Sequence, residues 1–147
     1  MNEFRQALAL NPADAAAHSN LGLALLDLGQ TDAAKAEFEA AIRANPDHAP
    51  AHSNLGNFYF RGGELARAAE QYRAALRLAP GFAQAHNNLG SVYFNMGQLD
   101  LAEQEYRRAL ALNPQLNDVR RNLDVVVNAR ARAAGTPAVP SSRPSSP

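Results

Sequence analysis

The sequence predicts an all-α protein, a solenoid of stacked helix-turn-helix units in which half a repeat comes first, three full repeats follow and a capping helix comes last. Three observations predict this fold. A short segment recurs with a period of 34 residues, as AHSNLG at 17–22 and 51–56 and as AHNNLG at 85–90. Within each unit, apolar residues fall at helical spacing on both sides of a glycine. A proline then ends each unit, because it cannot continue the helical hydrogen bonds. A period of this length is typical of repeat proteins.

The first element, residues 1–14, keeps the register of a second helix, with Phe4 and Pro12 at the positions that recur later. The chain therefore opens halfway through a repeat. A solenoid unit buries its apolar face only against its neighbours, so we expect this helix to expose apolar surface. A homodimer formed through this exposed N-terminal helix is one hypothesis, which sedimentation at micromolar concentration would test.

The three full repeats span 15–48, 49–82 and 83–116, and each is predicted to fold as two helices joined by a glycine turn. Gly29, Gly63 and Gly97 suit the residue just past a helix end, where a left-handed backbone costs glycine little. Small residues recur where we expect the two helices of a unit to touch. They are Gly22, Gly56 and Gly90 in the first helices and Ala34, Ala41, Ala68, Ala75, Ala102 and Ala109 in the second.

Prolines mark the ends of the predicted helices. Pro12, Pro46, Pro80 and Pro114 stand where each second helix ends, and Pro50 stands at a helix start, where its missing N–H matters least.

The last two elements differ from the repeats. Residues 117–134 keep the apolar register of a first helix but place Asp124 where earlier units have glycine, which predicts a capping helix with no second helix packed on it. Residues 135–147 hold four prolines and four serines, which predicts a disordered tail.

Composition excludes several classes of function. The 147 residues include 14 basic and 14 acidic side chains and no cysteine. Balanced charge without a Lys/Arg block argues against a nucleic-acid or membrane partner. The absence of cysteine excludes disulfides, a thiolate zinc site and a Cys nucleophile. No signal peptide or apolar run of roughly 18 residues is present, so we expect a cytoplasmic protein without a transmembrane segment.

These motifs resemble the tetratricopeptide repeat (TPR) family, whose pattern places L-G, a central aromatic, A, F, A and P at these intervals. The second unit matches it with Leu55, Gly56, Tyr59, Ala68, Tyr72, Ala75 and Pro80. The resemblance implies a right-handed superhelix that binds protein or peptide ligands and carries no catalytic site. One departure is that the bulky aromatic early in the first helix is replaced by His18, His52 and His86. Because equivalent histidines one repeat apart are too distant to share an ion bound at ~2.1 Å, we predict packing residues and neither a metal site nor a cofactor.

A candidate ligand-binding site is the set of asparagines that occupy one register position in every unit. In the resembled family the first helices line a concave groove, so these side chains would form a ladder with rungs about 10 Å apart, which an extended peptide spans in about three residues. A carboxamide both donates and accepts hydrogen bonds, so it can pair with ligand backbone whatever the ligand sequence. The alternative is that these side chains bond neighbouring repeats or face water. The ladder consists of Asn20, Asn54, Asn88 and Asn122.

Other positions are predicted to lie on the same face. Phe60 and Phe94, with Leu26 at the equivalent position of the first repeat, would anchor apolar ligand side chains, or would be ordinary packing residues. Variable positions that would tune selectivity are Ser53, Asn57, Arg61, Asn87, Ser91, Asn95 and Arg121.

The resemblance also bears on the kind of ligand. Members of the family that clamp chaperone C-termini use cations at positions that here read Ser19, Gln84 and Asn88, or Ser53, Asp118 and Asn122, so we reject that mode. The segment AHSNLGN is similar to repeats of O-linked N-acetylglucosamine transferases, where such a ladder holds protein substrate. Three hypotheses follow: a non-enzymatic interaction module that binds extended peptide, the substrate-presenting part of a larger glycosyltransferase, and a structural oligomerisation module.

Overall fold

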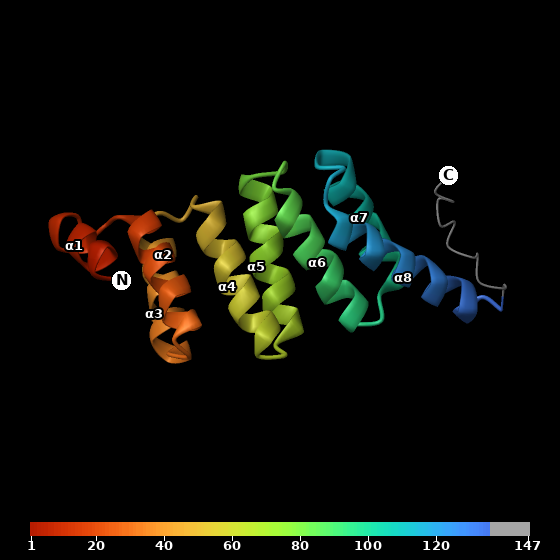
Figure 1. Ribbon diagram of the computed structural model, residues 1–147, viewed down its shortest axis with the longest axis horizontal. Helices are drawn as coiled ribbons and strands as arrows, with labels where there is room; N and C mark the ends of the chain where they lie inside the picture. The colour runs from red at the N-terminus through yellow and green to blue at the C-terminus, as the bar shows by residue number, and fades with distance from the viewer. Residues whose placement is uncertain (136–147) are drawn as a thin grey trace, which may run out of the picture.

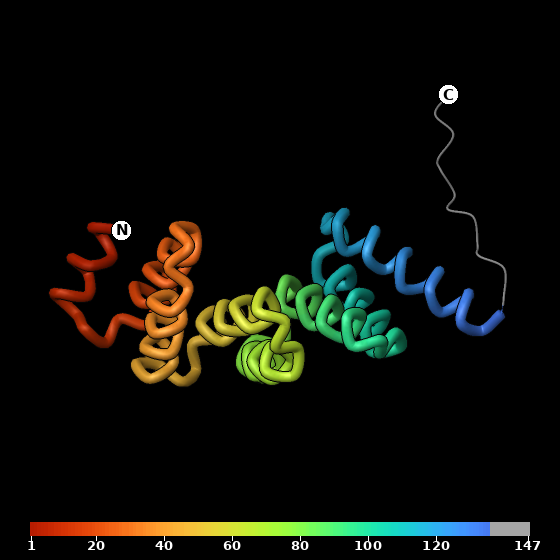
Figure 2. The backbone as a smooth tube through the Cα atoms, turned by 90° about the horizontal axis from the view of Figure 1, so that it is seen from below, coloured from red at the N-terminus to blue at the C-terminus, as the bar shows by residue number. Residues whose placement is uncertain are grey.

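The computed structural model describes residues 1–135, and the described part of the chain consists of helices without a strand. The helices follow one another in chain order along the long axis, with the first and last described helices at opposite ends (Figure 1). Seen from below, the row is curved rather than straight (Figure 2). The predicted all-α solenoid is therefore confirmed. The helices are α1 (Asn2–Leu10), α2 (Ala15–Asp27), α3 (Thr31–Ala44), α4 (Ala49–Arg61), α5 (Leu65–Leu78), α6 (Ala83–Asn95), α7 (Leu99–Leu112) and α8 (Asn117–Ala133).

The helices pack as hairpins. α2 packs on α3, α4 on α5 and α6 on α7, and successive hairpins meet through α3 with α4 and α5 with α6. The first helices also touch in series, α2 with α4, α4 with α6 and α6 with α8. One face of the array is therefore built from first helices alone.

The turns follow the local sequence signals. Gly29, Gly63 and Gly97 have φ angles of 73°, 74° and 73°, the left-handed conformation that glycine adopts readily. Pro50 lies in the first turn of α4. The prediction of glycine turns between the helices of each hairpin is confirmed.

Each hairpin is held by an aromatic ring of the second helix that lies on a glycine of the first. A Cβ atom built on Gly56 would lie 2.8 Å from the ring of Tyr72, and the same holds for Gly90 and Tyr106. At Gly22 the distance to the ring of Phe38 would be 2.5 Å. Because these three rings are buried, the hairpins depend on glycine at this position.

The last helix, α8, is attached to α7 by ion pairs. Arg130 bonds Asp100 at 2.6 Å and also contacts Glu103, both in the first half of α7. Asp124 is exposed, as expected of a helix without a partner on that side. The predicted tail of residues 135–147 lies outside the described residues except for Gly135. Among the described helices, none combines the length and apolar character needed to cross a bilayer.

Candidate binding groove

The face built from first helices carries a cavity of about 310 Å³. We call it the front groove. Three successive first helices contribute to it, so it joins all three repeats. Its lining residues are Leu23, Leu26 and Asp27 of α2, Asn57, Phe60 and Arg61 of α4, and Gln84 and Asn88 of α6.

The lining of the front groove combines apolar and polar residues. Leu23 is 39% exposed and, with Leu26 and Phe60, forms an apolar wall. The polar part of the lining consists of carboxamides from α4 and α6, together with Asp27 and Arg61. An apolar wall together with convergent polar groups is the usual composition of a ligand site.

The carboxamides of the front groove form a hydrogen-bonded network across repeats. The side-chain oxygen of Asn57 accepts from the Tyr72 hydroxyl at 2.6 Å and from Nδ2 of Asn88 at 2.9 Å. The side-chain oxygen of Asn88 accepts from Gln84 at 2.9 Å and from Asn87 at 3.2 Å. With the amides in these orientations, both oxygens are fully used and the free groups of Asn57 and Asn88 are N–H donors.

The four rungs of the predicted ladder are therefore not equivalent. Asn88 bonds α4, and Nδ2 of Asn122 donates to Asn87 at 3.3 Å. Asn20 is exposed and Asn54 is half-buried, and neither side chain has a hydrogen-bond partner within the described range. Two rungs thus contact their own scaffold, and two keep both donor and acceptor available.

The residue type at the position of Asn57 in each repeat depends on which aromatic residue the second helix of that repeat carries. Tyr72 donates to Asn57, and Tyr106 bonds Ser91 at 3.0 Å. Where the aromatic residue is Phe38, which has no hydroxyl, the position holds Leu23. A buried hydroxyl needs a hydrogen-bond partner. The presence or absence of the tyrosine hydroxyl therefore explains in part why this position varies between repeats.

Burial also changes the acidity of these tyrosines. It raises the pKa of the Tyr72 phenol above its usual range, and burial likewise raises the pKa of Tyr106. A group whose pKa is raised by folding contributes its full stability at pH values below its pKa in the unfolded chain, which is about 10 for tyrosine. This contribution is lost as the pH rises above that value. We expect the free energy of unfolding to fall above about pH 10, and to fall less steeply in Tyr72→Phe. Urea denaturation across this pH range measures it, and equal slopes for the two proteins would contradict the assignment.

The structure places the other predicted groove residues in different surroundings. Ser53 is 4% exposed, so its side chain is not presented to a ligand. Phe94 is 37% exposed and lies outside the front groove, unlike Phe60. Asn87 and Arg121 line a neighbouring cavity of about 680 Å³ between α6 and α8, where Arg121 pairs with Asp118.

Three residues of the front groove, Leu23, Asp27 and Gln84, are absent from the groove residues that the sequence predicts. Leu23 stands 34 residues before Asn57, and Gln84 was considered only as a clamp position. Extending the register of Asn57 to every repeat would have found Leu23.

The recurring histidines are structural, and they are polar rather than apolar packing residues. In each repeat Nε2 lies 3.0 or 3.1 Å from the carbonyl oxygen of the proline that precedes the hairpin. Nδ1 contacts a side chain of the second helix, Glu37 in the first repeat, Gln71 in the second and Glu105 in the third. Each histidine therefore ties the preceding loop to both helices of its hairpin. Within residues 1–135, no three His or acidic side chains are grouped to hold a metal ion.

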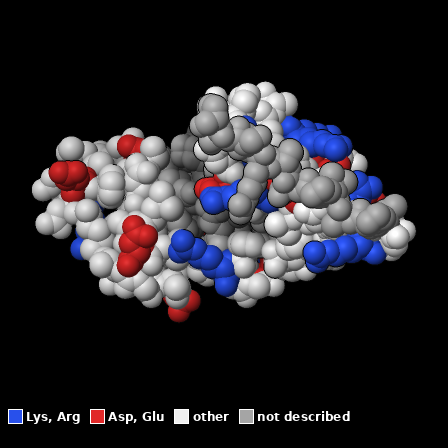
Figure 3. Space-filling model, turned by 45° about the vertical axis from the view of Figure 1, so that its right-hand side comes forward, with Lys and Arg blue, Asp and Glu red and all other residues white. Residues whose placement is uncertain are grey.

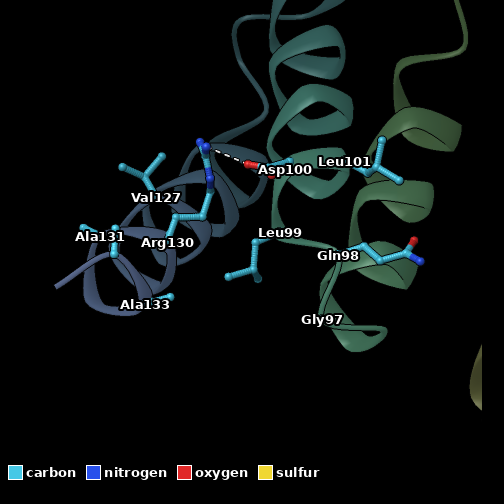
Figure 4. A pocket seen from close by; sticks show the side chains of 10 residues that line it. Gly97, Gln98, Leu99, Asp100, Leu101, Val127, Arg130, Ala131 and Ala133 are labelled. Carbon is cyan, nitrogen blue, oxygen red and sulfur yellow. Dashed lines mark ion pairs between the residues drawn. The ribbon is translucent and has the colours of Figure 1, made fainter. Parts of the chain in front are cut away.

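A larger cavity, of about 900 Å³, lies between the start of α7 and the end of α8. Figure 4 shows the Arg130–Asp100 pair at this cavity, with Leu99 and Val127 among the residues around it. Because these residues fasten α8 to α7, we assign the cavity to the cap.

Charge is distributed unevenly along the solenoid. Of the 14 basic residues only Arg5, Lys35 and Arg43 precede residue 61. Figure 3 shows basic side chains gathered on the C-terminal side of the view. The front groove lies where the acidic and basic halves meet, and it carries one exposed charge of each sign, Asp27 and Arg61.

Comparison with protein families identifies the repeats. Two models described as tetratricopeptide repeat match residues 20–81 and 83–116, and a third, described as TPR repeat, matches residues 1–29. No curated protein matches the chain.

Solved structures share the fold at low sequence identity. YrrB, titled a TPR protein with an unusual peptide-binding site, has a TM-score of 0.79 and 23% identity, over 90% of this chain and 68% of its own. The first TPR of Spaghetti (RPAP3), solved with an HSP90 peptide, has a TM-score of 0.78 and 24% identity, over 80% of this chain and 94% of its own. MamA has a TM-score of 0.77 and 22% identity, over 87% of this chain and 75% of its own.

Proposed function

Since the chain is an array of tetratricopeptide repeats, we propose that it is a non-enzymatic interaction module that binds an extended polypeptide segment in the front groove. The observation that carries the proposal is the cavity shared by α2, α4 and α6, with its apolar wall and its convergent carboxamides. Two fold neighbours are described with a bound peptide or with a peptide-binding site, which supports peptide as the ligand class.

The hydrogen-bond network defines the kind of contact expected. Because the oxygens of Asn57 and Asn88 are used within the protein, their remaining N–H groups would donate to backbone carbonyls of the ligand. Asn20 and Asn54 are not among the residues that line the front groove; they would extend the contact along the same register of α2 and α4 and would pair with both N–H and C=O of the ligand. An apolar ligand side chain would pack against Leu26 and Phe60. Such a groove forms hydrogen bonds with the ligand backbone at several points and selects mainly for one apolar side chain of the ligand.

The clamp for chaperone C-termini is not part of this proposal, because the cations that it requires are absent from the corresponding positions. The comparisons support the repeat family, and the similarity to glycosyltransferase repeats stays a prediction of the sequence. The same holds for a homodimer through α1.

The double variant Asn54→Ala with Asn88→Ala tests the ladder. We select binders from a displayed library of random 12-residue peptides on the unaltered protein and measure their affinity by fluorescence anisotropy. We expect the double variant to weaken binding by more than about tenfold, since each rung contributes a hydrogen bond of about 1 kcal/mol or more, with the far-UV circular dichroism unchanged.

The matched control is Gln6→Ala with Gln104→Ala, which removes two exposed carboxamides from second helices. It should leave the affinity unchanged. Equal affinities for the ladder variant and the unaltered protein would remove these asparagines from the mechanism.

A further inference from the structure

A second groove lies between two second helices, on a different face of α6 from the front groove. It has a volume of about 670 Å³, and we call it the back groove. α5 and α7 form its walls and do not pack on each other, and the buried residues of α6 form its floor. Its lining residues are Arg73, Leu76 and Pro80 from α5 and the loop after it, His86, Leu89 and Tyr93 of α6, and Glu105, Arg108, Ala111 and Leu112 of α7.

The walls of the back groove are apolar and partly open to solvent. Leu112 is 47% exposed and Leu76 is half-buried, on opposite walls, while Leu89 is buried beneath them. Aliphatic surface of this kind binds an aliphatic side chain by removing both from water.

Two arginines line the back groove, and only one of them pairs with a carboxylate. Glu105 lies 2.6 Å from Nδ1 of His86 and pairs with Arg108 at 2.7 Å, whereas Arg73 has no acidic partner within residues 1–135. Arg73 uses Nε and Nη2 to donate to the hydroxyl of Tyr93, at 3.1 and 2.8 Å. Arg108 uses Nη1 to donate to Glu105 at 2.7 Å. Each guanidinium therefore keeps N–H groups for a further acceptor.

The repeat scaffold does not require arginine at the positions of Arg73 and Arg108. One repeat earlier, between α3 and α5, Glu39 stands at the position of Arg73 and Ala74 at the position of Arg108. The histidine and proline of the same framework are retained there as His52 and Pro46. The pair of arginines is thus specific to one groove of the array.

We propose that the back groove is a second binding site, which takes an acidic peptide segment of a partner protein. An aliphatic side chain of the segment packs between Leu76 and Leu112. Carboxylates next to it accept hydrogen bonds from Arg73 and Arg108, whose planar guanidinium groups match carboxylate geometry. Charge complementarity selects this occupant, because the groove adds to an apolar trough the guanidinium of Arg73, which no carboxylate pairs within residues 1–135, and the remaining N–H groups of Arg108.

The test uses the whole chain, labelled with ¹⁵N, and an acetylated and amidated six-residue peptide in which two leucines stand between pairs of acidic residues. We expect chemical shift changes at backbone amides of α5 and α7 around Arg73 and Arg108. Two further peptides serve as probes, one with both leucines replaced by glycine and one with all acidic residues replaced by their amides. Each should bind at least about tenfold more weakly, as expected when a charged contact or an anchor is lost.

The variant Arg73→Gln with Arg108→Gln should weaken binding of the acidic peptide by about tenfold or more. Arg77→Gln with Arg132→Gln is the matched control, because it removes the same charge from exposed residues outside the groove. Asn54→Ala with Asn88→Ala should leave this binding unchanged, which separates the back groove from the proposed function of the front groove. An equal loss in the arginine control, shift changes confined to α2, α4 and the front face of α6, or no binding at millimolar peptide would each overturn the proposal.

Discussion

Replacing Glu105 by alanine is expected to lower the free energy of unfolding by about 3 kcal/mol, because it leaves a buried partner unpaired. Glu105 and His86 are both buried and lie 2.6 Å apart. Nε2 of the same ring faces the carbonyl of Pro80 at 3.1 Å, and a carbonyl only accepts, so the ring donates on that side. Glu105 is the one hydrogen-bond partner of Nδ1 within residues 1–135, so its removal leaves this nitrogen without a partner. Urea denaturation followed by circular dichroism measures the change.

The second repeat supplies the control for this prediction. There His52 makes the same contacts with Pro46 and with Gln71 in place of the glutamate. Glu105→Gln should therefore cost less than about 1 kcal/mol, since a carboxamide can satisfy the ring nitrogen. Glu70→Ala, at an exposed position of α5, should be close to neutral. A loss in Glu105→Gln as large as that in Glu105→Ala would show that charge, rather than hydrogen bonding, is what the site requires.

Replacing Gly56 by alanine is expected to destabilise the protein by about 2 kcal/mol. Overpacking of a core costs about 1–3 kcal/mol, and the better helix propensity of alanine offsets up to about 1 kcal/mol of it. The ring of Tyr72 cannot move aside easily, because it is 1% exposed and its hydroxyl is bonded to Asn57. A Cβ at residue 56 would lie 2.8 Å from that ring. The midpoint of urea denaturation reports the loss.

Gly62 is the matched control for the substitution of Gly56. It has a φ of −78°, and a Cβ built there would have no neighbour closer than 3.6 Å. Gly62→Ala should therefore change the free energy of unfolding by less than about 0.5 kcal/mol. In a Tyr72→Leu background, Gly56→Ala should cost less than it does alone, since the clash is with the ring. If the two substitutions are strictly additive, the contact between Gly56 and Tyr72 does not explain the glycine.

Most of the fold could be predicted because its signals are local. Gly63 has the left-handed conformation expected of a residue after a helix, and Pro50 stands in a first turn, where it needs no N–H partner. Gly56 was expected at a close approach from its periodicity, and the ring of Tyr72 occupies that approach. Each inference needed only the sequence around the residue and the repeat period.

The candidate site was less predictable, because it depends on contacts between repeats. The register identified Asn88 as a rung of a uniform ladder, and it did not reveal that Asn88 donates to Asn57 of the preceding hairpin. Ser53 shares the chemistry of an exposed polar residue but is buried. A helix position alone does not give exposure, since exposure depends on the neighbouring helix.

The sequence by itself determined the repeat, its turns and its helix ends, because backbone preferences of glycine and proline and the helical period of apolar residues act within a few residues of each position. Only the tertiary structure decided which carboxamides remain free for a ligand and that Arg73 and Arg108 line one groove. Hydrogen-bond partners and groove walls come from residues about one repeat apart, and stacking of the hairpins is what brings them together.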